Sequence, residues 1–252
     1  MDRLKEIWVT FWKNVWQTLK SSFIVLLMYF GVSSVVFMTT FKGTLTDGLT
    51  GTRAAWVFGG AAVAFAYQAV MMFATGGQGY EMLVSGNMKR RSAQAMGSTM
   101  KISSHKEEKE FRYWKGFASS WSIVLFVLVT GLVFGANQTE IDKIMASGDE
   151  KEVMSIGLGV VVLILMLLSG WSVLPFFYLN LGGVYVSYYW SILVAVLPVI
   201  VGGVFYIIGA YAERNKAIRK QEEADRASKA VLEKPKKINY GGLPGTKPNK
   251  KK

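Results

Sequence analysis

Charge-free apolar segments alternate with charged segments along this chain. The runs without Asp, Glu, Lys or Arg are 21–41, 54–80, 116–139 and 153–212. A membrane-spanning helix needs about 20 mostly apolar residues to cross roughly 30 Å of hydrocarbon. The pattern therefore predicts an all-α, polytopic integral membrane protein. The first three runs predict one span each, over 21–41, 54–76 and 116–136.

The distribution of Lys and Arg predicts the orientation of these spans. Four basic residues lie in 1–20, two in 42–53, eight in 81–115, two in 140–152 and thirteen in 213–252. Cytoplasmic loops of membrane proteins are enriched in Lys and Arg. We therefore expect a cell-membrane protein whose N-terminus, central polar stretch and C-terminal tail are cytoplasmic. The loops 42–53 and 140–152 are expected outside.

The fourth run must then start outside and end inside, which takes an odd number of crossings. It is long enough for three crossings of about 20 residues each, over 153–172, 174–190 and 192–212. Pro175 disfavours helix continuation near the first break, and aromatic residues near Trp190 suit an interface at the second. About six transmembrane helices are therefore expected. The alternative is one full span plus a re-entrant or kinked segment around 181–183, whose backbone would need protein or water around it.

The first twenty residues have a helical apolar period. One face of this predicted helix carries Leu4, Trp8, Phe11, Trp12, Val15, Trp16 and Leu19. The opposite side carries Lys13, Gln17 and Lys20. A basic helix with bulky aromatics on one face tends to lie in the membrane interface. We expect either an anchor that positions the first span or an elbow helix that carries force from a cytoplasmic partner.

The cytoplasmic stretch 81–115 contains a compact basic cluster, Lys89, Arg90 and Arg91. Such a cluster beside a span attracts anionic lipid, at roughly 1 kcal/mol per charge. Docking of an acidic cytoplasmic partner and enforcement of topology are the alternatives. Nucleic acid is not expected as a partner, because the cluster is short and the membrane already accounts for it.

The same stretch contains a signal for the start of a helix. Ser104 and Glu107 match a capping box, in which each side chain bonds to the other residue's backbone amide. The predicted helix starts near His105 and runs into the third span. It passes Tyr113 and Trp114, which suit the headgroup level of the bilayer.

The sequence carries no signature of catalysis or of a cofactor. There is no cysteine, which excludes disulfides and thiolate metal sites. No zinc-protease, serine-hydrolase or phosphate-loop motif occurs, and the glycines between 76 and 86 lack the spacing of a phosphate loop. No acid or base lies well inside a predicted span, which argues against a pump that uses buried carboxylates. We expect no enzyme activity, cofactor or metal.

Two amide side chains, Gln68 and Asn180, fall inside the predicted spans. We expect them to pair across helices, at about 0.6–2 kcal/mol; the alternative is that they line a path. The tail, 213–252, is basic overall and changes character midway. It predicts a charged helical extension of the last span and then a disordered segment rich in Pro, Gly and Lys. This last segment is expected to contact anionic lipid, the ribosome or a partner, or to act only as a solubilising segment.

In outline, the chain resembles the small six-helix permease subunits of ABC-type exporters. Those subunits have an amphipathic helix before the first span and a helical cytoplasmic loop, between spans two and three, that couples to an ATPase. The corresponding segments here are 4–19 and 81–115. Two departures are expected: there is no room for re-entrant helices between the last two spans, and the basic tail is unusually long.

The resemblance implies a non-catalytic transport subunit that relies on a separate cytoplasmic ATPase or on another membrane subunit. The alternative is a membrane scaffold or assembly factor that recruits lipid or protein through its basic loop and tail.

Overall fold

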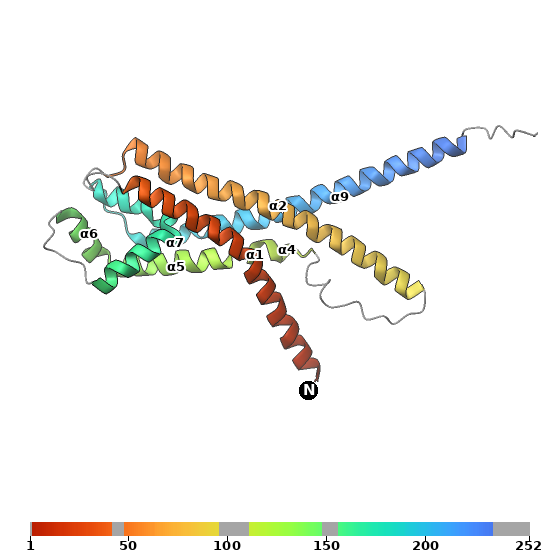
Figure 1. Ribbon diagram of the computed structural model, residues 1–252, viewed down its shortest axis with the longest axis horizontal. Helices are drawn as coiled ribbons and strands as arrows, with labels where there is room; N and C mark the ends of the chain where they lie inside the picture. Colours follow the sequence, from red (N-terminus) through yellow and green to blue (C-terminus); the bar gives the residue numbers. More distant parts are fainter. Residues whose placement is uncertain (1, 42–47, 96–110, 148–155, 234–252) are drawn as a thin grey trace, which may run out of the picture. The chain divides into compact units, whose positions relative to one another are not determined.

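A computed structural model describes residues 2–41, 48–95, 111–147 and 156–233, and the described part of the chain is helical with no strand. Figure 1 shows the elements in sequence order. They are α1 (Asp2–Thr40), α2 (Gly51–Ala95), α4 (Tyr113–Ala118), α5 (Trp121–Ala136), α6 (Gln138–Ser147), α7 (Ile156–Leu181), η2 (Tyr188–Trp190), α8 (Ser191–Val194) and α9 (Val196–Glu233). The chain forms two compact units, residues 1–213 and 214–252.

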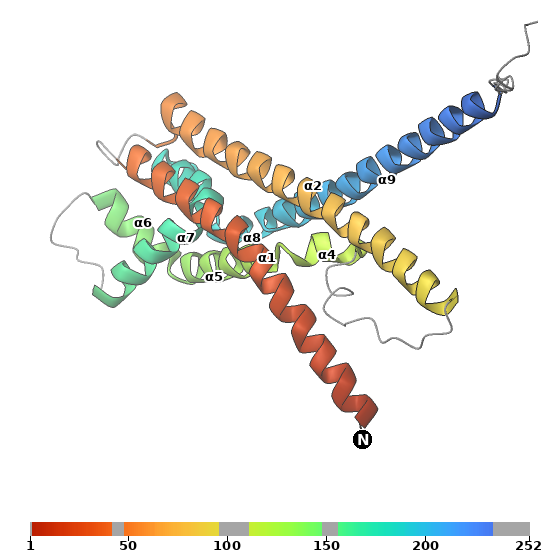
Figure 2. The same cartoon turned by 45° about the vertical axis from the view of Figure 1, so that its right-hand side comes forward.

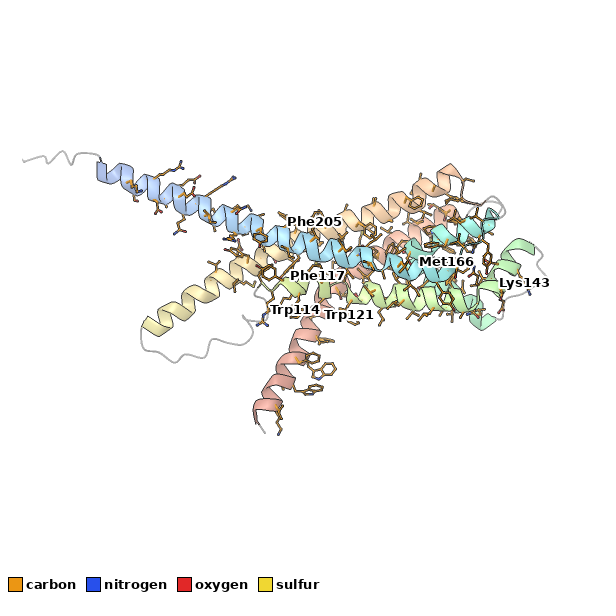
Figure 3. All side chains as sticks on the ribbon, turned by 180° about the vertical axis from the view of Figure 1, so that it is seen from behind. Trp114, Phe117, Trp121, Lys143, Met166 and Phe205 are labelled. Carbon is orange, nitrogen blue, oxygen red and sulfur yellow. The ribbon has the colours of Figure 1, made fainter. Side chains whose placement is uncertain are left out.

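Five helical segments of the described chain are long and apolar enough to cross a membrane. They are Ser22–Thr40, Gly51–Gly86, Tyr113–Ala136, Gly157–Leu181 and Tyr188–Lys229. The all-helical class is confirmed, and these segments support a membrane-embedded protein. Their outward-facing side chains include many exposed Leu, Ile, Val and Phe residues, which Figure 3 shows along the bundle. Such a surface suits a hydrocarbon surrounding.

The helices of 153–212 have other boundaries than the expected spans over 153–172, 174–190 and 192–212. α7 continues through Pro175, where a break was expected, and the chain leaves helical structure only after Leu181. The internal break lies instead at Ser169, with φ −138° and ψ 24°. A Ser–Gly pair and a proline are both residue types that kink helices, and α7 contains both within one short stretch. The chain turns again directly after α7, and Gly183 in this turn has φ +80°. Such a positive φ favours glycine.

Two further boundaries differ from the expected ones. Residues 2–20 are helical, but they belong to the same continuous helix as the first span and do not form a separate element. The segment 140–152 was expected as an external loop, and its first part lies in α6. The acidic side chain Glu140 lies in the first turn of α6, where it complements the helix dipole.

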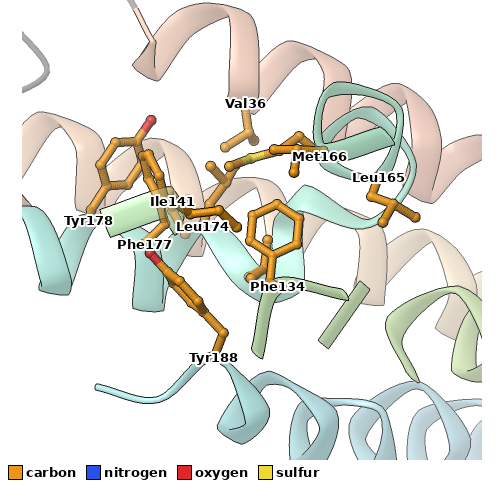
Figure 4. Packing of buried hydrophobic residues seen from close by; sticks show 12 residues of the cluster. Val36, Phe134, Ile141, Leu165, Met166, Leu174, Phe177, Tyr178 and Tyr188 are labelled. Carbon is orange, nitrogen blue, oxygen red and sulfur yellow. The ribbon is translucent and has the colours of Figure 1, made fainter. Parts of the chain in front are cut away.

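The membrane-embedded bundle has two apolar clusters. One joins α1, α2, α5, α6, α7 and η2 and includes Val36, Phe134, Met166, Leu174 and Tyr178, as Figure 4 shows. The other lies nearer the start of α1 and α5 and includes Tyr29 and Trp171, whose ring centres are 5.1 Å apart. α1 packs on both α2 and α7, and α5 packs on α7.

Glycines allow α2 and the first half of α9 to touch backbone to backbone. A Cβ added at Gly209 would overlap the carbonyl oxygen of Phe73, and one at Gly76 would overlap that of Tyr206. Small residues permit such close approach between membrane helices. These two positions therefore fix where the two helices cross.

Candidate functional site

Gln68 is the centre of a buried polar network inside the bundle. The Tyr29 hydroxyl donates to Gln68 Oε1 at 2.6 Å. Gln68 Nε2 donates to Ser120 Oγ at 2.9 Å and to the carbonyl oxygen of Pro198 at 2.8 Å. The Ser120 hydroxyl also donates to the Pro198 carbonyl, at 2.9 Å. An amide has two donors and one acceptor oxygen, so each polar atom of Gln68 has a partner.

The network ties together parts of the chain that are far apart in sequence. Its members come from α1, α2, the turn between α4 and α5, and the first turn of α9. Pro198 fits in that first turn because the first amides of a helix have no intrahelical acceptor. Gly202 lies one turn later, and a Cβ there would overlap Ser120 Oγ at 2.6 Å. Glycine at this position therefore lets the network close.

A second polar group surrounds the break in α7. The Ser169 and Thr130 hydroxyls bond to each other. The Ser172 hydroxyl donates to the Ser169 carbonyl at 2.7 Å, and the Trp171 amide donates to Ser33 Oγ at 3.4 Å. Residues 169–174 are buried. The side chains of α1, α5 and α7 thus bond groups that the break frees, which is the condition for non-helical backbone at membrane depth.

The far end of the bundle, which we call the Thr40 end, gathers polar residues of several connections. The Tyr178 hydroxyl donates to Thr40 Oγ1 at 2.6 Å. Arg53 donates from Nε to the Thr40 carbonyl at 3.2 Å and from Nη1 to the Gly48 carbonyl at 2.9 Å. Its guanidinium lies 5.1 Å from the centre of the Tyr178 ring, a cation–π distance. The end of α7 is therefore fixed to the α1–α2 connection.

The Thr40 end also holds the segment after α7. The Tyr188 hydroxyl donates to Asp142 Oδ1 at 2.7 Å, and Gln138 Nε2 donates to the Val186 carbonyl at 2.9 Å. Asn180, expected inside the membrane, lies near the end of α7 and bonds both ways to Val186, at 2.6 and 3.0 Å. It closes a local turn, and its side chain also bonds to Tyr188, the first residue of the apolar segment Tyr188–Lys229.

The sequence-predicted interface residues lie on exposed faces. Trp8, Phe11, Trp12 and Trp16 are all more than half exposed on the N-terminal part of α1, and Lys20 lies 5.4 Å from the Trp16 ring centre. Trp8 and Phe11 stack at 5.9 Å. Tyr113 and Trp114 are exposed in α4, and Figure 3 shows Trp114 near the start of that segment.

The basic cluster Lys89, Arg90 and Arg91 lies in the C-terminal part of α2. α2 continues helically from the apolar segment that ends at Gly86 through this cluster to Ala95. The predicted capping box, Ser104 and Glu107, lies outside the described residues, as does His105. The next described helix, α4, begins at Tyr113 without a side-chain cap at Arg112.

The chain returns to α2 after this stretch. The amide of Phe111 donates to the carbonyl of Gly79 at 2.9 Å, and the Phe111 ring stacks on Tyr206 of α9 at 5.3 Å. The contact joins the two residues that flank 80–110 in the sequence, of which 80–95 belong to α2. We call this segment, residues 80–110, the excursion.

Sequence reasoning missed Arg53, Asp142, Tyr178 and Tyr188 as structural polar residues. Arg53 had been counted only as a loop charge, although it is a cation next to an apolar run and is 7% exposed. No group of three or more His, Asp or Glu side chains in the described chain is placed to hold a metal ion. Comparisons with protein-family models, with curated proteins and with solved structures found no match to this chain.

Proposed function

We propose that this protein is a non-catalytic, permease-type membrane subunit that works with a separate cytoplasmic ATPase through its excursion. The observation that carries the proposal is the contact between the two residues that flank the excursion, where Phe111 bonds to Gly79. Connections in compact domains are usually about 4–6 residues, and longer ones tend to be functional or disordered. A short connection would be enough to join two neighbouring spans. The excursion is much longer than such a connection, and its residues 80–95 are helical.

The continuity of α2 is what makes the excursion suitable for coupling. This helix has 45 residues. At about 1.5 Å per residue such a helix extends about 68 Å, roughly twice the hydrocarbon thickness. The basic cluster therefore sits on the same rigid helix as the buried Gln68. A partner that moves the cluster also acts on the membrane-embedded part without an intervening joint.

Electrostatics supports an acidic partner surface. Three adjacent cations on a helix attract a complementary acidic patch and steer its approach. The same charges also attract anionic lipid. The two sources of attraction are separable, because protein docking needs a specific partner whereas lipid attraction needs only the charge.

The test neutralises the cluster. A Lys89→Gln, Arg90→Gln, Arg91→Gln variant, purified from native membranes, should lose a co-purifying ATPase and keep its membrane insertion. A matched control is Arg219→Gln, Lys220→Gln, Arg226→Gln, which removes the same charge from exposed positions of α9; it should keep the partner. The proposal is wrong if all co-purifying proteins are unchanged and only binding to anionic vesicles falls.

A scaffold or assembly function is the second candidate, and a specific observation favours it. Both polar atoms of the Gln68 amide form hydrogen bonds within the bundle, so the amide does not present an unbonded donor or acceptor to a transported solute. A scaffold predicts a reproducible co-purifying protein set without an ATPase. The same purification from native membranes therefore discriminates between the two candidates.

A further inference from the structure

We propose that α7 does not cross the membrane but is a re-entrant helical hairpin, which enters and leaves at the Thr40 end with its tip at Ser169. The membrane domain then has four crossing segments and one hairpin. This inference does not depend on the proposed function, because it concerns only how the chain is threaded.

Helix length is the first argument. The break at Ser169 divides α7 into residues 156–168 and 170–181. At about 1.5 Å per residue these halves extend roughly 20 Å and roughly 18 Å, and neither spans the hydrocarbon thickness of about 30 Å. The whole of α7 has 26 residues. An unbroken helix of that length would reach about 39 Å and could cross the membrane. The non-helical geometry at Ser169 therefore decides whether α7 crosses or returns to the side on which it began.

The tip lies at mid-depth. Ser169 bonds to Thr130, which lies near the middle of α5 and six residues before the end of the apolar segment Tyr113–Ala136. Trp171 packs against Tyr29, near the middle of Ser22–Thr40, and its ring centre is 5.5 Å from that of Phe65 in α2. Three neighbouring segments therefore place the break away from both ends of the bundle.

The second half of α7 ends at the Thr40 end. Leu174 packs in the same cluster as Val36, and one turn later Tyr178 bonds to Thr40. Gly182 then lies against Gly48, where an added Cβ on Gly48 would meet the Gly182 backbone at 2.7 Å. The chain thus moves from mid-depth to the α1–α2 connection within these residues.

The first half begins at the same end. Leu158 packs against the cluster that contains Phe134 and Ile141, which flank the α5–α6 junction. α6 packs on α7, and Figures 1 and 2 both show the first turns of α7 beside α6, with the second half of α7 returning to that end. The two halves also share one cluster, since Met166 and Phe177 both belong to it, as Figure 4 shows.

The charge pattern gives independent support. With five crossings, the thirteen Lys and Arg residues of 213–252 would lie on the opposite side from the eight in 81–115. Four crossings put both sets on one side, as the enrichment of basic residues in cytoplasmic segments requires. A hairpin in α7 therefore agrees with the distribution of Lys and Arg in 81–115 and 213–252, two segments outside α7.

Single cysteines in this cysteine-free chain test the threading. The test sites are Thr139→Cys before α7 and Val184→Cys after it, both exposed at the Thr40 end. The sites for the other side are Ser85→Cys in α2 and Ser228→Cys in α9, both exposed. Sealed membrane vesicles of both orientations, intact and inverted, are treated with a membrane-impermeant maleimide, and permeabilised vesicles give full labelling as the reference.

The hairpin predicts that Thr139→Cys and Val184→Cys label in the same vesicle orientation and lose labelling together in the other. Ser85→Cys and Ser228→Cys should show the reverse. A crossing α7 would put the first two sites on opposite sides and would give Ser228→Cys the same side as Thr139→Cys. That result overturns the proposal. Tyr185→Cys, at a position that is 75% exposed, is a second site after α7 for the case that Val184→Cys folds poorly.

Discussion

Among single residues, Gln68 separates two explanations of a polar side chain inside a membrane. A path-lining amide would keep part of its hydrogen-bonding capacity for a solute or water. Gln68 instead donates and accepts within 2.6–2.9 Å of three partners from distant parts of the chain. Its arrangement is that of a side chain that holds helices together, and the two explanations predict different consequences of its removal.

We expect Gln68→Leu to destabilise the bundle by about 2 kcal/mol, since interhelical hydrogen bonds in membrane proteins average about 0.6 kcal/mol and reach about 1.7 kcal/mol. Unfolding in mixed micelles with increasing SDS measures the change. Tyr29→Phe added to Gln68→Leu should recover part of the loss, because it removes the hydroxyl that Gln68→Leu leaves unpartnered. An unchanged midpoint for Gln68→Leu would contradict a packing role.

Glycine positions at the α2–α9 crossing allow a matched comparison. A new methyl group at Gly209 overlaps the Phe73 backbone. Gly209→Ala should therefore destabilise by about 1–3 kcal/mol, because the helices must separate. Gly59→Ala, in the same α2 helix as Phe73 with no atom within 4 Å of the new Cβ, should be neutral or slightly stabilising through its better helix propensity. The SDS midpoints of the two variants check this; equal effects would argue against backbone contact at Gly209.

The sequence indicated part of this residue-level structure. Gln68 stood out because it is an amide in a long apolar run, and that signal is local. Its partners Ser120 and Pro198 are 52 and 130 residues away, so no periodicity or spacing could show them. Asn180 gave the same local signal, yet it closes a turn with Val186, six residues on, at the end of its helix. Composition locates a polar residue but does not identify its partner.

At the scale of elements, the lengths of the apolar runs predicted where the helices lie better than helix-breaking residues predicted where the helices end. The span over 21–41 and the segment Ser22–Thr40 nearly coincide. Pro175 was expected to end a helix, but α7 continues through it and breaks at Ser169. The reason is tertiary: Thr130 and Ser33, from other helices, bond at this break, and no neighbour in sequence reveals them.

The continuous α2 helix predicts that coupling depends on stiffness between the membrane and the basic cluster. Ser85 is an exposed position between them. Ser85→Pro removes one helical hydrogen bond and clashes with the preceding turn, at about 3 kcal/mol. Under the proposed function, this variant should keep the co-purifying ATPase, because the cluster is intact, but should weaken the effect of the protein on ATP turnover. Ser85→Ala should retain both. Full stimulation in Ser85→Pro would show that α2 stiffness is irrelevant.

On the scale of the whole molecule, the division into two units separates membrane packing from charge. The first unit ends at Glu213 and contains both apolar clusters, whereas the second contains thirteen of the chain's 29 Lys and Arg residues. All of its described residues up to 229 are exposed. The stability of the bundle should therefore not depend on the second unit.

Truncation after Glu213 tests that independence. We expect an unchanged SDS midpoint and weaker binding to vesicles that contain anionic lipid, since a basic residue near such a surface contributes roughly 1 kcal/mol. Truncation after Glu233 is the control and should lose only part of the binding. A lower midpoint after removal of 214–252 would mean that the second unit supports the bundle.

The crossing of α2 and α9 also has a mechanical consequence. The backbones touch at Gly76, which lies on α2 between Gly51 and Arg91. At the helical rise, Gly76 is about 22 Å from Arg91 and about 38 Å from Gly51 along the helix. If the crossing acts as a pivot, a displacement of the basic cluster by about 3 Å would shift the other end of a stiff α2 by about 5 Å. The contacts of Arg53 with Thr40 and Gly48 are at that far end, so they set the resistance against which the helix would turn.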